Sequence, residues 1–479
     1  MVGRFLLYLA VFTASYAVKA ELYVFPAPSP EATSHTLNTE ITLYEEQTLS
    51  AIEQKNIDLL IKDTYQTLDK SNATSALSEI NQRYKGTLPA WLYSAIKRCE
   101  DWFNRTEGNI SCRNGALYDY WAEYVQGKHD LSRREVRRLA RVARIAEVNF
   151  NDDNSVAFAS PIQWDLSEFT ASLAVDRIAN YLTSINIRSY HISAQGLETH
   201  ASNQGFSWQG TVAQEAVIQN GRATDAVSNP STIAYIRPWQ RPVLSTSKLA
   251  SLEKGVLSHS DGWPSAKFQA ISVADNAFEA MLLAHFSATK TAQQAMELVN
   301  ANPSLALKLI DENGRVFTSN TYTARTSGKN KAEKNGHAIS IDITLPLFDI
   351  ADYRGPYVSV WISDEKNRLV KSLALRGTSE RWLGELRTWW RRVGRKNEGL
   401  VDGFAGATKK NAPLHIKWDG LDDFGQSANS SSLILHVEVA REHGGRSYEK
   451  IPFTFDSLTS PITVTGTNEI ASITLSLMN

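Results

Sequence analysis

The two cysteines are the first residues whose type and spacing could do chemistry. Cys99 and Cys112 are the only cysteines in the 479 residues, which is the wrong number for a structural zinc site. In an oxidising compartment they can pair. A disulfide that closes a loop of about a dozen residues stabilises a protein by roughly 3 kcal/mol in the chain-entropy description. The sequence leaves two alternatives open, a Cys99–Cys112 disulfide or two separately buried thiols.

The first twenty residues favour an oxidising compartment. Arg4 precedes an apolar run over residues 5–14, and Val18 and Ala20 place small side chains at the −3 and −1 positions of a cleavage site. This arrangement predicts a signal peptide cleaved after Ala20 and a periplasmic or otherwise extracytoplasmic protein that begins at Glu21. An uncleaved N-terminal anchor is the alternative. No later stretch has the 18 or so apolar residues that span a bilayer, so no membrane span is expected after cleavage.

Composition limits the functions that need to be considered. A formal net charge of −1 gives no global attraction to nucleic acid or to an anionic membrane. The chain has no P-loop, no Rossmann glycine fingerprint, no Ser/His/Asp order and no metal-spaced set of histidines and cysteines. At roughly 100–200 residues per domain, the length predicts two or three domains.

The elements expected up to residue 318 are mixed. Apolar residues at helical spacing predict helices over residues 48–68, 88–103, 133–148, 172–182, 274–286 and 291–299, and Ser132 is a good N-cap for the third of these. Short apolar runs predict strands over residues 156–158, 189–193 and 305–310. The pattern is that of an α+β domain.

A different pattern follows residue 319. Residues 319–336 are rich in Ser, Thr, Asn, Lys and Gly and predict a linker. Alternating runs then predict strands over residues 338–345, 357–362, 369–375, 414–418 and 433–440, which is typical of an all-β, immunoglobulin-like sandwich. The predicted organisation is therefore a signal peptide (1–20), an α+β domain (21–318), a linker (319–336) and an all-β domain (337–479).

Four segments of the α+β domain occur in the order of a known family. They are residues 75–81, ending in Asn81; residues 106–108, with Trp121 after them; Asp165-Leu166; and residues 255–264. They resemble the ApbE-type FAD:protein FMN transferases, which have an early segment ending in Asn, a Thr-Asp-Gly segment followed by Trp, a core Asp-Leu-Gly-Gly segment, and a His-x-x-Asp-Pro-x-Thr-Gly-x-Pro motif. The resemblance implies FAD as the substrate, Mg²⁺ as the metal that neutralises phosphate charge, and transfer of FMN to a Ser or Thr of another protein.

The departures from the family pattern fall on groups that do its chemistry. Gly255 replaces the motif His, Ser258 its Asp and Asp261 its Thr; Ala171-Ser172 replaces Lys-Gly, and Gln195-Gly196-Leu197 stands where Gly-Gly-Asp is expected. Three outcomes stay open: residual transfer of FMN, flavin binding without catalysis, and a purely structural role.

Two carboxylates are the metal candidates that the resemblance leaves. Glu279 lies near the position of a metal-ligand Asp, and with Asp261 it could offer Mg²⁺ hard oxygen ligands. Two ordinary surface carboxylates are the alternative.

Residues from about 335 to 479 resemble an uncharacterised extracytoplasmic domain family that often accompanies ApbE-like domains. The match rests on residues 382–392, 401–408, 418–425 and 437–444. The first of these segments carries Trp382, Trp389 and Trp390 among arginines, which could stack a flavin or form an amphipathic helix. The third, Trp-Asp-Gly…Asp-Asp-x-Gly, suggests a tight turn rather than a calcium loop. In the last, His443 could belong to a redox site or to the end of a hairpin.

The second segment suggests an acceptor site. Asp402, Gly406, Ala407 and Thr408 have the spacing of the Asp-x-x-Ser/Thr-Gly-Ala-Thr site at which extracytoplasmic redox proteins accept FMN through a phosphoester, although Ala405 departs from it. Small neighbours would let an enzyme approach the Thr408 hydroxyl, and the two lysines that follow would offset the charge of a phosphate. A glycine-containing turn before the strand at 414–418 is the alternative.

Three functions are compared on these grounds. The first is a flavin-associated protein, in which an impaired transferase-like domain is joined to a domain that carries FMN or binds FMN or FAD. Its expected partners are flavin, a separate intact flavin transferase and an envelope redox protein, with no nucleic acid. The second is an active, Mg-dependent FMN transferase. The third is a non-enzymatic envelope scaffold.

Overall fold

The structure is a computed structural model that describes most of the chain. The described residues are 3–7, 20–26, 38–44, 47–158, 162–194, 197–201, 207–212, 216–222, 231–236, 256–265, 267–311, 313–322, 338–346, 348, 353, 355–377, 383–396, 412–428, 432–442 and 444–478. The chain divides into two compact units. The N-terminal unit comprises Met1–Phe206 and Ala223–Thr289, and the C-terminal unit comprises Ser207–Arg222 and Lys290–Asn479.

An antiparallel sheet forms the centre of the N-terminal unit. The strands that belong to this unit are, in spatial order, β1 (Gly3–Leu7), β2 (Ala20–Phe25), β3 (Thr39–Leu43), β7 (Tyr190–Ala194), β8 (Leu197–Ala201), β11 (Ser231–Ile236) and β14 (Phe268–Ala274). Side chains two residues apart share one face of a strand. Tyr23 and Phe25 of β2 are such a pair, and they are fully buried, as are Ile41 of β3 and Ile192 of β7. Strand β1 lies within the predicted signal peptide and pairs with β2, with Leu7 opposite Ala20.

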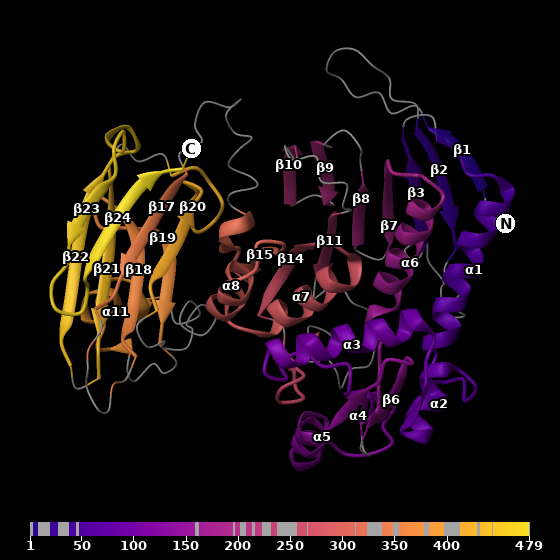
Figure 1. Ribbon diagram of the computed structural model, residues 1–479. Helices are drawn as coiled ribbons and strands as arrows, with labels where there is room; N and C mark the ends of the chain where they lie inside the picture. The colour runs from indigo at the N-terminus through magenta and orange to yellow at the C-terminus, as the bar shows by residue number, and fades with distance from the viewer. Residues whose placement is uncertain are drawn as a thin grey trace. The chain divides into compact units, whose positions relative to one another are not determined.

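Helices α6 (Thr170–Ser184) and α7 (Ala277–Thr289) pack on this sheet, and α1 (Ala51–Leu68) packs on α6 (Figure 1). Helix α7 is buried on all sides, as a helix that is hydrophobic all round must be. It begins three residues later than predicted because Ala274 still belongs to β14. Helix α1 also begins three residues later than predicted, since Ser50 and Glu53 form a capping box at its start.

A second group of elements lies below the main sheet in Figure 1. It contains α2 (Ala76–Arg83), α3 (Ala90–Arg105), α4 (Gly115–Val125), α5 (Arg133–Ile145) and a small sheet of β4 (Lys85–Thr87), β6 (Ser155–Phe158) and β5 (Val148–Phe150). The predicted cap of α5 is confirmed, because the Ser132 side chain accepts a hydrogen bond from the Glu135 backbone. Val136, Ala140 and Ala143 form the buried face of α5.

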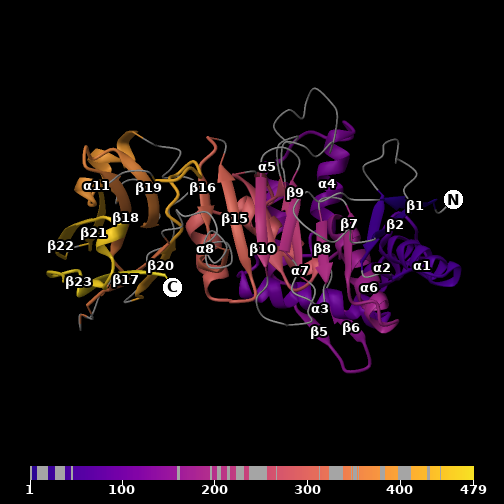
Figure 2. The same cartoon turned by 90° about the horizontal axis from the view of Figure 1, so that it is seen from above.

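The C-terminal unit contains a sandwich of two antiparallel sheets, seen edge-on in Figure 2. One sheet has the order β20 (Leu414–Trp418), β17 (Ile339–Thr344), β24 (Ser472–Leu477), β23 (Ile462–Thr465), and the other has β19 (Leu369–Arg376), β18 (Tyr357–Asp364), β21 (Leu433–Ala440), β22 (Arg446–Phe453). Buried aliphatic side chains from both sheets, such as Ile341, Val360 and Val437, form one core. The two antiparallel sheets confirm the predicted all-β class.

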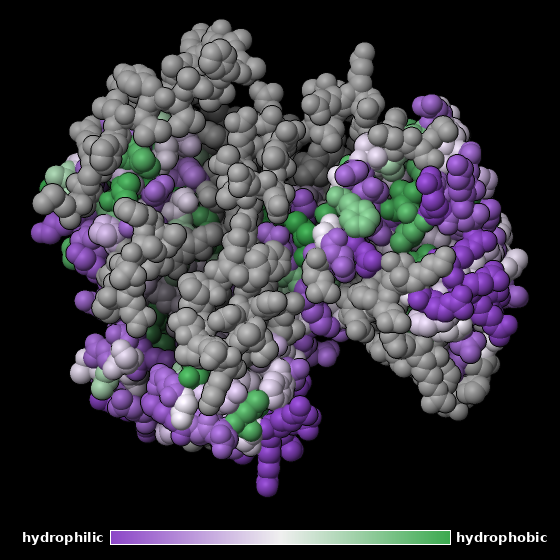
Figure 3. All heavy atoms as spheres, turned by 180° about the vertical axis from the view of Figure 1, so that it is seen from behind, coloured by the Kyte–Doolittle hydropathy of each residue, from purple (hydrophilic) through white to green (hydrophobic). Residues whose placement is uncertain are grey.

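Shorter elements complete the described chain. They are α8 (Ala292–Asn300), β15 (Ala306–Asp311), β16 (Val316–Thr318), the hairpin of β9 (Ser207–Val212) and β10 (Ala216–Arg222), β12 (Val256–Leu257), β13 (Pro264–Ser265), α11 (Arg387–Arg392), and the 3-10 turns η2 (Ser167–Phe169), η4 (Gly394–Lys396) and η5 (Phe455–Ser457). Among the described residues, no helix is both long and apolar enough to cross a bilayer. Hydrophilic side chains cover much of the described surface in Figure 3.

Candidate functional site

Three polar side chains of the N-terminal unit meet from three separate segments. The Tyr118 hydroxyl on α4 donates a hydrogen bond of 2.8 Å to the Glu168 carboxylate on η2, and it lies 3.0 Å from Nε2 of His259. His259 lies in the turn between β12 and β13 and is 2% exposed. These residues belong to, or adjoin, three of the segments that resemble the family motifs, so the network lies where those segments come together.

The hydrogen bonds define the protonation of this network. Nδ1 of His259 accepts a hydrogen bond of 2.9 Å from the Ser111 backbone N–H. A backbone N–H can only donate, so Nδ1 carries no proton and His259 is the neutral tautomer with its proton on Nε2. Nε2 therefore donates to the Tyr118 hydroxyl, which in turn donates to Glu168. The donors point in one direction, from Ser111 through His259 and Tyr118 to the carboxylate.

A second histidine approaches the same carboxylate. Nδ1 of His285, on α7, lies 3.2 Å from the Glu168 carboxylate, and its side chain is fully buried while that of Glu168 is 18% exposed. The His285 ring also packs against Phe169, with the ring centroids 5.0 Å apart. The network thus joins α4, η2, α7 and the β12–β13 turn through groups that can hold or pass a proton.

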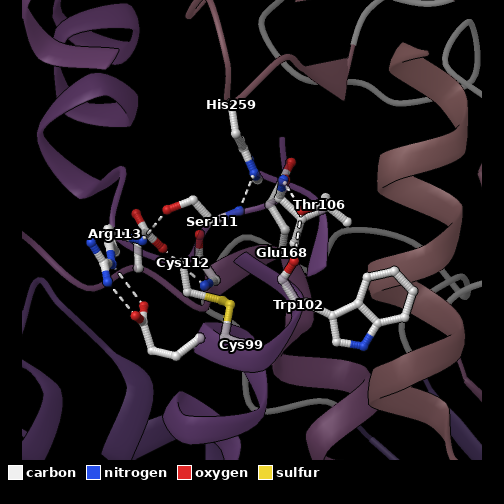
Figure 4. Close-up of a disulfide and its surroundings, with 12 residues drawn as sticks. Cys99, Trp102, Thr106, Ser111, Cys112, Arg113, Glu168 and His259 are labelled. Carbon is white, nitrogen blue, oxygen red and sulfur yellow. Dashed lines mark hydrogen bonds and ion pairs between the residues drawn. A yellow bond between two sulfur atoms is a disulfide. The ribbon is translucent and has the colours of Figure 1, made fainter. Parts of the chain in front are cut away.

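The disulfide lies next to this network, as Figure 4 shows. Cys99 on α3 is bonded to Cys112, one residue after Ser111. The Cys112 carbonyl accepts a hydrogen bond of 2.8 Å from the Asp165 backbone N–H. The disulfide therefore links residues 111–112 to α3. Ser111 orients His259, and Cys112 binds the backbone of Asp165, three residues before Glu168.

A buried ion pair supports the same segment. Arg113 donates from Nε to the Glu100 carboxylate at 2.7 Å, and a second nitrogen of its guanidinium contacts the other carboxylate oxygen. Both side chains are buried. Arg113 also donates to the Ala146 carbonyl just after α5, so it connects α3, the disulfide segment and the end of α5. Removing either partner of such a pair leaves an uncompensated buried charge.

Asp165, which opens the segment resembling Asp-Leu-Gly-Gly, is held from two sides. One carboxylate oxygen accepts from the Ser167 backbone at 2.9 Å, and the other lies 2.6 Å from the Lys70 ammonium. Burial opposes the charge of Lys70, but Asp165 and Asp119 outweigh it and raise the pKa of Lys70. The adjacent backbone of Trp164 exchanges two hydrogen bonds with the Asn81 side chain. The early Asn and the core Asp of the resemblance therefore meet in space.

Gly262 fixes the turn that carries His259. Its φ is +80°, and a Cβ added there would lie 2.9 Å from Cγ1 of Val136 on α5. The Gly262 carbonyl accepts a hydrogen bond of 2.9 Å from the Trp121 indole. Only glycine combines this backbone conformation with so close an approach, so the turn depends on the Gly of the motif.

The two metal candidates have other partners. Asp261 is exposed and accepts a hydrogen bond from the Trp263 backbone two residues later. The Glu279 carboxylate, on α7, lies 3.6 Å from the Arg105 guanidinium. Within the part of the chain that the structure describes, no group of three or more His, Cys, Asp or Glu side chains could hold a metal ion. Each of the two carboxylates thus has another partner, and Mg²⁺ binding by Asp261 and Glu279 stays a prediction.

A further carboxylate, which was not predicted from the sequence, lies beside Glu279. Asp176, on α6, accepts hydrogen bonds from the backbone N–H groups of Ala277 (2.6 Å) and Phe278 (3.1 Å) at the start of α7. Burial, with a smaller effect of Glu279, raises the pKa of Asp176 to about 6 against the lowering effect of these two donors and of Arg98. Asp176 thus caps α7 from a neighbouring helix.

The acceptor candidates Asp402, Gly406, Ala407 and Thr408 lie outside the described residues, as do Gly255, Gln195, Trp382 and His443. Trp389 is described and is 2% exposed. The Glu438 carboxylate binds its backbone N–H and that of Thr388. Trp389 is therefore a core residue of α11 and is not free to stack a flavin.

The third segment of the C-terminal resemblance forms a turn, as the sequence suggests. Gly420 and Gly425 both have φ of +78°, and the Asp422 carboxylate accepts from the backbone of Phe424 and Gln426. Asp423 is buried and accepts from the Ser372 backbone. The carboxylates of Asp422 and Asp423 thus accept backbone hydrogen bonds that stabilise the turn and its contact with β19.

Four site residues were not predicted from the sequence: His259, Tyr118, Glu168 and His285. His259 occupies the Pro position of the motif and Glu168 the second Gly position of Asp-Leu-Gly-Gly, so both were visible as departures. Their contact was not, because residues 118 and 259 are brought together only by the tertiary fold.

Comparisons with known proteins agree with this architecture. Residues 36–309 match the ApbE family, and residues 338–472 match DUF2271, which is described as a predicted periplasmic protein. Solved structures with a similar fold include the flavinyl transferase ApbE of Pseudomonas stutzeri (13% identity, 66% of this chain and 99% of that chain, TM-score 0.51) and the ApbE protein of Thermotoga maritima (16% identity, 60% and 96%, TM-score 0.50). No curated protein matches the chain. At these identities the structural likeness shows the fold alone.

Proposed function

This chain belongs to the ApbE family, and we propose that its ApbE-like domain has lost efficient FMN transfer and is joined to a C-terminal domain that carries FMN placed there by another enzyme. The observation that carries the first part is the contact of Tyr118 with Glu168 and His259. It places the Glu168 carboxylate where the resemblance expects a Gly and the His259 imidazole where it expects a Pro, and Tyr118 joins the two.

The charge of Glu168 is the main obstacle to the family reaction. ApbE-type chemistry acts on the pyrophosphate of FAD, and the Gly-Gly of Asp-Leu-Gly-Gly would allow a close approach of backbone to phosphate. Glu168 puts a side chain and a negative charge at the second of these positions. Two like charges 4 Å apart repel by about 4 kcal/mol at an effective dielectric of 20. In this segment the Lys70 ammonium already pairs with Asp165, so we expect it to compensate little of that repulsion.

We expect the replaced motif residues to lower the rate of FMN transfer as well. Removing one group that stabilises a transition state typically lowers the rate by about 10² to 10³, although several such losses need not add. Gly255 and Ser258 stand for two such groups. We expect their loss, together with Glu168, to reduce transfer below detection.

The test is an FMN-transfer assay with FAD, Mg²⁺ and a flavin-acceptor protein. We expect no transfer by this chain under conditions in which an intact ApbE transferase modifies the same acceptor. A triple variant that restores the family residues, Glu168→Gly with Gly255→His and Ser258→Asp, should regain part of the activity. Turnover by the wild-type chain comparable to that of the intact enzyme would instead establish an active transferase.

The proposed acceptor in the C-terminal domain is Thr408. A threonine hydroxyl is a poor nucleophile at neutral pH and needs a base or metal to activate it. We expect the ApbE-like domain of this chain to activate it poorly, because Gly255 and Ser258 replace the His and Asp of the motif. We therefore expect FMN on Thr408 only when an intact transferase is co-expressed. The measurement is the mass of the tryptic peptide that contains Thr408, with Thr408→Ala as control. An unmodified peptide beside an active transferase would remove the acceptor role and leave a scaffold function.

Export is part of the same proposal. The match of residues 338–472 to a predicted periplasmic family agrees with a signal peptide at residues 1–20, and a redox partner would then also lie in the envelope. N-terminal sequencing of the protein from the periplasm should give Glu21. Recovery of Met1 from a cytoplasmic fraction would contradict export.

A further inference from the structure

A cavity of about 300 Å³ lies in the C-terminal unit, between α8 and β16 on one side and strands β19 and β20 on the other. Its apolar wall includes Phe317, Leu373, Leu414 and Trp418. This volume is at the lower end of the range of about 300–1,000 Å³ found for small-molecule sites. An apolar wall of this kind suits the body of a small organic molecule.

The charged residues that line the cavity are mostly cations. They are Lys371, Arg376 and Lys417, against the single carboxylate of Glu297, among the described lining residues. The ammonium of Lys371 donates to the carbonyls of Val316 and Asp422. Lys417 is half-buried, and no ion pair of its ammonium is found among the described residues. Lys371 and Arg376 lie 3.9 Å and 3.7 Å from the carboxylates of Asp423 and Glu297, so Lys417 carries the positive charge of the cavity that the described carboxylates leave uncompensated.

Arg376 has hydrogen-bonding capacity left at the cavity. One of its terminal nitrogens donates to the Ala412 carbonyl at 2.7 Å, whereas its buried Nε has no hydrogen-bond partner among the described residues. The nearest carboxylate oxygen, on Glu297, is 3.7 Å away. Burial lowers the pKa of Arg376. A buried donor without a partner is costly, and an anionic ligand oxygen would satisfy it.

We propose that this cavity binds an organic phosphate with an apolar ring system, of which FMN is the relevant member, through Arg376 and Lys417 at the phosphate and Phe317, Leu373 and Trp418 at the ring. The choice of FMN rests on the proposed function. Arg and Lys are the usual partners of phosphate, and the apolar wall supplies the burial that a ring needs.

The short distance along the chain between Thr408 and two residues that line the cavity supports this ligand. Ala412 and Pro413 line the cavity, and Thr408 precedes Ala412 by four residues. Four residues span at most about 14 Å, so a group bonded to Thr408 is tethered close to the cavity by chain length alone. The same cavity could then receive FMN either free or attached to the chain.

The test uses the full-length Thr408→Ala protein, so that free binding is measured without covalent attachment. FMN and riboflavin are titrated by fluorescence anisotropy, with inorganic phosphate as competitor. We expect FMN to bind about ten- to a hundredfold more tightly than riboflavin, as charge-assisted contacts to a phosphate would give, and phosphate to weaken FMN binding only. Equal affinities for FMN and riboflavin would overturn the proposal.

Two variants locate the binding. Lys417→Glu should remove the preference for FMN, whereas Lys366→Glu, an equal charge change at an exposed site, should leave it unchanged. Leu373→Trp should fill the cavity and weaken both flavins, with circular dichroism to verify folding. FMN binding that survives both Lys417→Glu and Leu373→Trp would overturn the cavity as its site. Free binding in the Thr408→Ala protein is measured independently of Thr408 modification, so failure of the acceptor role and failure of the cavity are distinguishable.

Discussion

The Tyr118 hydroxyl lies 3.0 Å from Nε2 of His259, although 141 residues separate them in the sequence. The same hydroxyl donates to Glu168, so one side chain satisfies a histidine and a carboxylate in a partly buried site. Networks of this kind stabilise a structure when every member is paired and destabilise it when one is removed. The stability of the ApbE-like domain should therefore report on this contact.

Tyr118→Phe should destabilise the N-terminal unit. The substitution keeps the ring and removes both hydrogen bonds, so the His259 N–H and the Glu168 carboxylate each lose one hydrogen bond. We expect a loss of about 1–3 kcal/mol in the free energy of unfolding, measured by urea denaturation. Tyr84→Phe is the matched control, since Tyr84 is 40% exposed and its ring stays against Phe158; it should change stability by less than about 0.5 kcal/mol. Equal effects of the two substitutions would show that the contact does not stabilise the fold.

Gly262→Ala should cost more than Gly127→Ala. Both glycines have a positive φ, +80° and +72°, but a Cβ at Gly262 would lie 2.9 Å from Val136, whereas at Gly127 nothing lies within 4 Å. Both variants incur the left-handed backbone penalty of about 1–2 kcal/mol, and Gly262→Ala adds overpacking of about 1–3 kcal/mol. Thermal unfolding of the two variants measures the difference. A difference near zero would mean that α5 moves away from the turn at little cost.

The sequence predicted most elements because their signals are local. The strands predicted at Leu414–Trp418 and Leu433–Ala440 agree with the structure at both ends, since the alternation of apolar and polar residues and the flanking turn residues define them locally. The Ser132 cap is equally local. The Asp176 cap on α7 is not, because donor and acceptor come from helices 101 residues apart. The candidate site was predictable only in part for the same reason: the motif resemblance located its segments, but the contact of Tyr118 with His259 depends on how α4 and the β12–β13 turn pack.

Asp176 should make the unfolding free energy depend on pH. Its folded pKa of about 6 lies above the ordinary Asp value of 3.8, so the native state holds the proton more tightly than the unfolded chain. The contribution is fully present below pH 3.8 and is lost as the pH rises through 6, by up to about 3 kcal/mol at 1.36 kcal/mol per pH unit. Asp176→Asn keeps an acceptor for the Ala277 backbone and removes the titration. The stability of the wild type relative to Asp176→Asn should therefore fall between pH 4 and pH 7; a constant difference would contradict the raised pKa.

His436 in the C-terminal unit has a pKa shifted in the opposite direction to that of Asp176. It is fully buried, and its ring stacks on Trp361 with centroids 4.6 Å apart. The Ser363 hydroxyl donates to the Asp364 carbonyl, so Ser363 accepts from Nε2 of His436 and Nδ1 accepts from the Tyr448 hydroxyl. This network uses the neutral ring in a single tautomer. Burial, with Arg392 and Lys450, lowers the pKa of His436 to about 3.

His436 should therefore make the sandwich sensitive to acid. The unfolded chain binds a proton at His436 below pH 6.5 and the native state does not, so the contribution is present above pH 6.5 and is lost as the pH falls toward 3. At 1.36 kcal/mol per pH unit, about 3 kcal/mol is lost by pH 4. His436→Gln removes the titration, so the advantage of the wild type over the variant should shrink from pH 7 to pH 4 in urea denaturation followed by tryptophan fluorescence. His415→Gln, at an exposed histidine on β20, should keep the acid sensitivity of the wild type because His436 is intact. If His436→Gln lost stability on acidification as steeply as the wild type, the acid sensitivity would have to come from other groups, and the neutral buried ring would not be its cause.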